Sequence, residues 1–133
     1  MSNRVVHFEI HSSDTKKSMK FYKELFGWEF EKYPMEGVEY WGILTAPKDS
    51  KEIGINGGLV KRMGTLPTEG GAVNAFVCTV QVSNLDEMVS KAGQIGGSVA
   101  HPKMAIPGMA WLAYCKDNEG NIFGLFQEDK TAK

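Results

Sequence analysis

The chain has 133 residues, of which 42% are hydrophobic, and it carries 15 lysines and arginines against 16 aspartates and glutamates. This length suits one domain with a core of its own. A net charge of −1 lacks the basic excess expected of a nucleic-acid-binding protein. No apolar run reaches the roughly 20 residues of a membrane-spanning helix, and the N-terminus has no signal-peptide core. We expect a cytoplasmic protein that binds neither nucleic acid nor membrane.

The first predicted element is a strand over residues 5–11, where polar and apolar residues alternate. Side chains in a strand point alternately to its two faces. His7, Glu9 and His11 are therefore expected on one face, and Phe8 is expected with the other apolar residues against a helix. This alternation makes His7 and Glu9 neighbours on a polar surface.

A helix and three strands are expected next, which completes the first half of the chain. Asp14 is the predicted N-cap of the helix and Gly27 its stop signal. Gly57 and Gly58 lie in the last strand, where they indicate a β-bulge or a close approach of a ligand to the backbone, and we favour the bulge. The helix is predicted over residues 15–26, and the strands over residues 28–33, 39–45 and 53–60.

The second half repeats this pattern after a linker at residues 61–72, which is rich in glycine and has no periodicity. Asn84 and Glu87 have the spacing of a capping box at the start of a helix. The helix is expected to end at residues 96–97. Strands are predicted over residues 73–82, 98–101, 109–116 and 122–127, and the polar tail at residues 128–133 is expected to be frayed.

An offset of 70 residues superimposes the two halves, since Asp14 falls on Asn84 and Gly27 on Gly97. Each half then reads strand, helix and three strands. A half of this size buries little apolar surface alone, so pairing two halves is the expected solution. We predict one α+β domain over residues 1–133, with module one at 5–60 and module two at 73–127.

Several motifs in this order resemble the vicinal oxygen chelate superfamily, which includes glyoxalase I, extradiol dioxygenases, fosfomycin-resistance proteins and bleomycin-binding proteins. The opening run His7-Phe8-Glu9-Ile10 and the closing turn and strand at residues 117–123 are similar to the family's own. The resemblance implies two βαβββ modules whose curved mixed sheets form a cup around a small molecule. The other motifs are Asp14, Ser18, Phe21-Tyr22, Leu25-Phe26-Gly27-Trp28, the run at residues 82–86 and Gly96-Gly97-Ser98-Val99.

The resemblance also implies a divalent metal ion held by two side chains from each module. His7 matches the first ligand position. The second falls in residues 55–59, which contain no carboxylate, and the third and fourth fall on Val77 and Gly124. Catalytic sites keep about three protein ligands, so we expect no bound metal and no lactoylglutathione lyase activity. A loose site made of His7, Glu9 and water is the alternative.

The candidate site residues follow from their places on the implied cup. His7 is the catalytic candidate, as a general base or only a polar lining residue. Trp41, Trp111 and Tyr40 could stack on a planar ligand or belong to the core. The loop at residues 106–109 resembles a segment that covers the cup, or is a simple connector. The ligand-binding set is predicted as His7, Glu9, Trp41, Met109, Trp111 and Gly124.

The predicted function is a glyoxalase-like small-molecule-binding protein without a bound divalent metal or other cofactor. The alternative is an enzyme of the lyase, isomerase or dioxygenase type, metal-dependent or not, acting on a small molecule in the cup. A homodimer is expected from the family. Cys78 and Cys115 lack metal-type spacing and are predicted to be free thiols.

Overall fold

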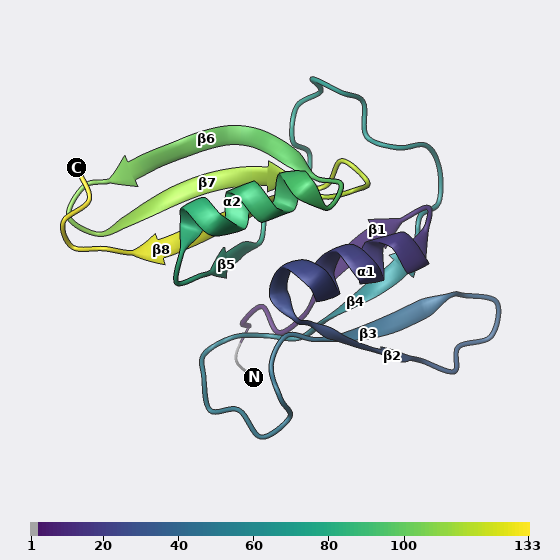
Figure 1. Ribbon diagram of the computed structural model, residues 1–133. Helices are drawn as coiled ribbons and strands as arrows, with labels where there is room; N and C mark the ends of the chain where they lie inside the picture. Colours follow the sequence, from purple (N-terminus) through teal and green to yellow (C-terminus); the bar gives the residue numbers. More distant parts are fainter. Residues whose placement is uncertain (1–2) are drawn as a thin grey trace. The chain divides into compact units, whose positions relative to one another are not determined.

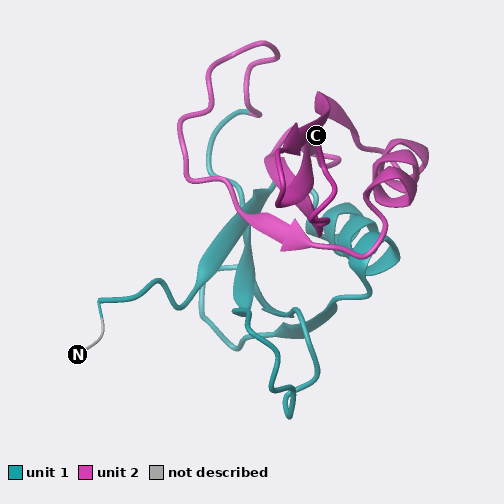
Figure 2. Ribbon diagram, turned by 90° about the vertical axis from the view of Figure 1, so that its left-hand side faces the viewer, with its two compact units in different colours: residues 1–65 teal, residues 66–133 magenta. Residues whose placement is uncertain are grey.

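A computed structural model describes residues 3–133, and the chain divides into two compact units, residues 1–65 and 66–133 (Figures 1 and 2). The division falls inside the segment predicted to be a linker. Each unit is described below by itself. No helix within the described residues is long and apolar enough to cross a membrane.

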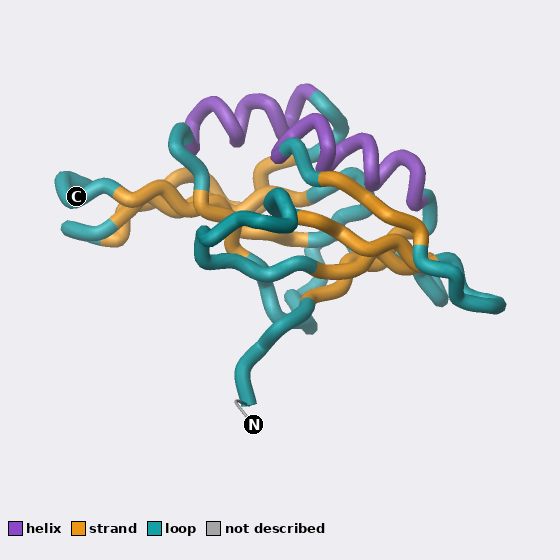
Figure 3. Tube along the Cα trace, turned by 90° about the horizontal axis from the view of Figure 1, so that it is seen from below, coloured by secondary structure: helices purple, strands orange, loops and turns teal. Residues whose placement is uncertain are grey.

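The first unit contains a mixed sheet of four strands in the order β1-β4-β3-β2. β1 is parallel to β4, while β3 pairs antiparallel with both β4 and β2. One helix lies against this sheet (Figure 3). The elements are β1 (Phe8–Ser12), α1 (Thr15–Phe26), β2 (Glu29–Lys32), β3 (Tyr40–Leu44) and β4 (Gly57–Lys61).

The second unit has the same topology, with the strand order β5-β8-β7-β6 and β5 parallel to β8. Thr79 lies opposite Gly124, as Glu9 lies opposite Gly58 in the first unit. The two α+β βαβββ repeats predicted from the sequence are therefore confirmed. The elements are β5 (Thr79–Gln81), α2 (Leu85–Gln94), β6 (Ser98–Ile106), β7 (Ala110–Lys116) and β8 (Ile122–Glu128).

The core of the first unit lies between α1 and the sheet. Leu25 of α1 and Leu59 of β4 are buried there. The ring centroid of Phe8 lies 6.1 Å from that of Trp28, which in turn stacks 5.2 Å from Tyr22. Phe8 thus faces the helix, as predicted. We call this side of the sheet the helix side, and the opposite side, which carries Glu9, the open side.

The predicted helix boundaries are confirmed at both ends of α1. The Asp14 side chain accepts a hydrogen bond from the Lys17 backbone N–H at 3.1 Å, and Gly27 follows the helix with φ 75°. An N-cap carboxylate satisfies one of the N–H groups that have no partner inside a helix. Glycine adopts a positive φ without the steric cost of a Cβ.

Loss of this cap should destabilise the protein measurably. We expect Asp14→Ala to lower the free energy of unfolding by about 1 kcal/mol, because the Lys17 N–H loses its acceptor. Urea denaturation followed by circular dichroism measures the change. Lys16→Ala is the matched control, since Lys16 is exposed in the same turn. An equal loss in both variants would contradict the role of the cap.

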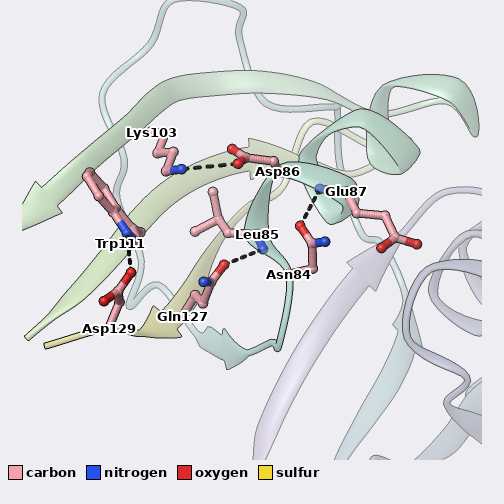
Figure 4. Close-up of polar contacts among 8 residues, drawn as sticks. All are labelled: Asn84, Leu85, Asp86, Glu87, Lys103, Trp111, Gln127 and Asp129. Atoms are coloured by element: carbon pink, nitrogen blue, oxygen red, sulfur yellow. Dashed lines mark hydrogen bonds and ion pairs between the residues drawn. The ribbon is translucent and has the colours of Figure 1, made fainter. Parts of the chain in front are cut away.

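In the second unit α2 is capped by Asn84, whose side chain accepts from the Glu87 N–H at 3.1 Å. The Leu85 N–H at the helix start donates to Gln127 Oε1 of β8 at 2.8 Å (Figure 4). Leu85 and Leu125 are fully buried. The predicted cap is confirmed, and β8 directs Gln127 to the helix side of its sheet.

Several sequence predictions need correction, and the first two concern strand starts, since β1 begins at Phe8 and not at residue 5, and β4 begins at Gly57 and not at residue 53. β5 begins only at Thr79, and β6 continues to Ile106 although a stop near His101 was expected. Pro102 is tolerated because β6 is an edge strand with a register shift at this point, so the missing N–H breaks no ladder. The tail is not frayed either, since Ala132 is buried and its carbonyl accepts from the Gly108 N–H at 2.8 Å.

The β-bulge favoured at Gly57 and Gly58 is also wrong. Both glycines keep an unbroken register with β1 and with β3. Their missing side chains make room for neighbouring ones. A Cβ at Gly57 would lie 2.8 Å from the ring of Phe8, and a Cβ at Gly58 would overlap the hydroxyl group of Tyr40. The glycines thus allow side chains of this same chain to lie against β4.

Candidate functional site

A polar cluster lies on the open side of the first sheet, where His7, Tyr40 and Glu9 are joined by hydrogen bonds. His7 Nε2 lies 2.7 Å from Tyr40 Oη. The same hydroxyl group donates to Glu9 Oε2 at 3.1 Å. His11 Nε2 lies 3.8 Å from the other carboxylate oxygen of Glu9. These side chains form the candidate site, and His7 and Glu9 are exposed.

Alternation along β1 and a glycine in β4 build this cluster. His7, just before β1, and Glu9 point to the same side because they are two residues apart. Tyr40 comes from β3, so β4 separates it from β1. Its ring reaches Glu9 only because Gly58, directly opposite Glu9, has no side chain. The cluster therefore depends on a contact across three strands.

The phenol of Tyr40 is held in its protonated form. Its pKa is raised to about 12, first because burial disfavours the phenolate, and then because the hydroxyl group donates to Glu9 and lies near that negative charge. At neutral pH Tyr40 is an uncharged hydrogen-bond donor and acceptor. It is therefore a poor ligand for a divalent cation under these conditions.

A second tyrosine widens the aromatic surface of this site. The ring centroid of Tyr33 lies 5.7 Å from that of Tyr40, with the planes tilted by 58°. Tyr33 lies beside Gly42, whose added Cβ would come within 2.8 Å of its ring. Tyr33 remains 52% exposed. The open side thus presents a tyrosine ring next to the polar cluster.

Within the first unit, the structure brings together two of the predicted ligand-binding residues, His7 and Glu9. Trp41 lies on the helix side, where it pairs in register with buried Leu59 and donates to Glu39 at 3.1 Å. Glu39 also accepts from Thr15 of α1. Trp41 is therefore held by its own unit on the side away from His7.

The remaining predicted residues lie in the second unit. Trp111 donates to Asp129 at 3.0 Å, and Lys103 Nζ lies 4.5 Å from its ring centroid (Figure 4). Met109 is 56% exposed in the β6–β7 turn, where its N–H donates to the Ile106 carbonyl at 3.0 Å. This turn is a hairpin connection. Gly124 is buried on the side of its own sheet that faces away from α2, where an added Cβ would lie 2.8 Å from Thr79 Oγ1.

Sequence reasoning left Tyr33 out of the site and treated Tyr40 only as a stacking candidate. The signal that could have found Tyr40 is the pair of glycines in β4. A glycine inside a strand often marks the close approach of another group. Which group approaches depends on strand order, which no local pattern reveals. The pairing β1-β4-β3 places Tyr40 there.

The side chains do not fit the divalent metal site that the resemblance implies. Gly58 and Gly124 occupy equivalent places in the two repeats, and neither supplies a donor. The Tyr40 hydroxyl group fills the space above Gly58. Within residues 3–133, no three His, Cys, Asp or Glu side chains are grouped so that they could hold a metal ion. His7 alone remains, with its Nε2 already bonded to Tyr40.

Comparison with known proteins yields one matching sequence family and two curated relatives. Residues 4–43 match the family described as bleomycin resistance protein-like N-terminal. Over 124 residues the chain is 24% identical to the glyoxylase-like protein CFP32 of Mycobacterium tuberculosis, covering 92% of this chain and 44% of the relative. CFP32 of Mycobacterium bovis matches equally. The chain thus spans less than half the length of these relatives.

Solved structures with the same fold include a glyoxalase family protein from Bacillus cereus, with a TM-score of 0.73, 18% identity and coverage of 96% of this chain and 95% of that one. A glyoxylase/bleomycin resistance protein/dioxygenase domain from Frankia sp. EAN1pec has a TM-score of 0.72, 15% identity and coverage of 97% and 100%. The fosfomycin resistance protein FosX from Listeria monocytogenes has a TM-score of 0.71, 16% identity and coverage of 94% and 91%. At these identities the likeness establishes the fold.

Proposed function

We propose that this chain is a member of the vicinal oxygen chelate superfamily that binds a small molecule and works without a divalent metal. One observation carries the proposal. Tyr40 takes the space above Gly58 and bonds to both His7 and Glu9. The Tyr40 hydroxyl group and its hydrogen-bond partners thus occupy the place where the family resemblance implies a metal ligand.

The chemistry of the donors supports this proposal. Zinc, nickel and iron sites are built from imidazole, carboxylate and thiolate groups that converge on one ion. Here Glu9 accepts a hydrogen bond from Tyr40, and the retained imidazole is bonded to the same hydroxyl group. Binding a metal through His7 Nε2 would require this bond to break. These hydrogen bonds support a site in which the polar groups contact a ligand directly.

Metal analysis of the purified full chain tests the proposal. We expect no stoichiometric divalent metal by mass spectrometry after dialysis, and turnover of methylglyoxal with glutathione near background when nickel or zinc is added. About one tightly held metal per chain, lost in His7→Ala, would overturn the proposal.

A screen of ligands completes this test. A thermal-shift series of thiols, aromatic acids and drugs on the full chain should raise the midpoint of unfolding for at least one class, because a ligand that binds only the folded state stabilises it. The rise should be lost in Tyr40→Ala and kept in Lys16→Ala. Stabilisation that Tyr40→Ala leaves intact would place the ligand elsewhere.

A metal-independent enzyme is the second candidate, and a specific observation favours it. The imidazole of His7 is linked through Tyr40 to a carboxylate, an arrangement that can orient a general base. Turnover of a bound ligand that disappears in His7→Ala would select the enzyme over the binding protein.

The homodimer expected from the family is likewise a proposal, which sedimentation equilibrium tests.

A further inference from the structure

The hydrogen bonds of the cluster have only one consistent direction. The Tyr40 hydroxyl group owns one proton, and an ionised carboxylate can only accept. Tyr40 therefore donates to Glu9 Oε2, at 3.1 Å. Having donated its proton, its oxygen must accept at the 2.7 Å contact with His7, so the proton there belongs to His7 Nε2. The tyrosine pKa of about 12 agrees, since Tyr40 keeps its proton at neutral pH.

From the direction of these hydrogen bonds we infer that Tyr40 and Glu9 hold neutral His7 with its proton on Nε2. His7 Nδ1 is then an open acceptor for a hydroxyl or N–H group of a ligand, and this part of the inference rests on the proposed function. Tyr40 is here a positioning residue that acts through His7. Among residues 3–133, His7 makes no hydrogen bond besides the one to Tyr40. Its ring is exposed, so Nδ1 is available to a ligand.

The open acceptor narrows the class of ligand. The lone pair of a neutral Nδ1 attracts a donor and repels the lone pairs of a carboxylate or phosphate group. The negative charge of Glu9 also disfavours an anionic ligand. Glu9 is linked to the His7 ring by the two hydrogen bonds of the Tyr40 hydroxyl group. The exposed ring of Tyr33 beside Tyr40 offers a flat apolar surface. An aromatic ring with a hydroxyl group, a phenol, satisfies these features together.

The tautomer can be measured in the full chain without any ligand. Long-range proton–nitrogen correlation spectra of the 15N-labelled protein, at a pH about two units above the ordinary histidine pKa of ~6.5, separate the two neutral tautomers. We expect His7 to carry its proton on Nε2. Tyr40→Phe keeps the ring over Gly58 but removes the acceptor, so the other tautomer should appear. Tyr33→Phe is the matched control and should leave the His7 signals unchanged.

A charge reversal at Glu9 provides the sharpest version of this test. An ammonium group can only donate. In Glu9→Lys the lysine would donate to Tyr40, Tyr40 would donate to His7 Nε2, and the His7 proton should move to Nδ1. Glu9 is exposed, so the variant is expected to fold. A wild-type His7 protonated on Nδ1, or a tautomer that neither Tyr40→Phe nor Glu9→Lys alters, would overturn the inference.

Three small probes then test the ligand class. Phenol should shift the His7 Nδ1 resonance in a saturable way. Anisole, which has the ring without a donor, and benzoate, which offers only acceptors, should leave it unchanged. A response to benzoate or anisole equal to that of phenol, or no response to phenol, would overturn the assigned ligand class. Failure of the proposed function is separate, since it would show as stoichiometric metal or as no stabilisation across the wider ligand screen.

Discussion

Replacing Gly57 with alanine should lower the free energy of unfolding by about 3 kcal/mol, the upper end of the range for overpacking a core. The new Cβ would lie 2.6 Å from the Phe8 carbonyl oxygen and 2.8 Å from its ring. The carbonyl belongs to β1, which pairs with β4 at this position. Backbone cannot swing aside as a side chain does, so the strands themselves must separate. Urea denaturation monitored by circular dichroism measures the loss.

Gly54→Ala is the control for this substitution. Gly54 is exposed three residues earlier, and an added Cβ there has nothing within 4 Å. Both variants restrict the unfolded chain equally, an effect of about 0.4–1 kcal/mol in favour of the folded state. The two variants should therefore differ in free energy of unfolding only through the steric clash of the Gly57→Ala Cβ with Phe8. Equal stabilities for the two variants would show that β1 and β4 are not packed as closely as described.

The neighbouring substitution Gly58→Ala should have a smaller effect on stability, about 1–2 kcal/mol, and a larger one on the site. Its Cβ would overlap the end of the Tyr40 ring, which is a side chain and can rotate away. Rotation breaks the bonds of Tyr40 to His7 and Glu9, and each such bond contributes about 1 kcal/mol. We therefore expect His7 to lose its fixed tautomer in Gly58→Ala, as in Tyr40→Phe.

A double variant separates this mechanism from general damage to the strand. In a Tyr40→Ala background the ring is absent, so adding Gly58→Ala should cost clearly less than it does in the wild type. Residues in contact show such coupling, with interaction energies of about 0.5–3 kcal/mol. Unfolding free energies of the two single variants and the double variant complete the cycle. Additive losses would mean that Tyr40 does not occupy the space above Gly58.

The sequence alone determined the features that depend on neighbours along the chain. The N-cap at Asp14, the glycine stop at Gly27 and the apolar stripe between them specify α1, and its bounds are as predicted. The alternation around Phe8 likewise determined which side of β1 meets the helix. A helix cap, a positive φ and a period of two are local properties, so they can be read without knowing the fold.

The pattern of the sequence at an offset of 70 residues indicated two strand–helix–three-strand repeats, and family resemblance added the expectation that His7 lies on a functional surface. It also showed that Val77 and Gly124 cannot supply metal ligands, because these residues have no donor atoms in their side chains. Neither step required coordinates. The role of His7 remained open, because the role of a single histidine depends on the side chains that it contacts.

Only the tertiary structure decided which side chains join His7. Tyr40 is 33 residues away from it in sequence, and their contact depends on the strand order β1-β4-β3 and on Gly58 between them. The same pairing turned Trp41 to the helix side, which alternation could not assign without a register. Tail burial at Ala132 also follows from a long-range bond, to Gly108. Cross-strand contacts join residues distant in sequence, and no periodic pattern along the chain encodes which of them meet.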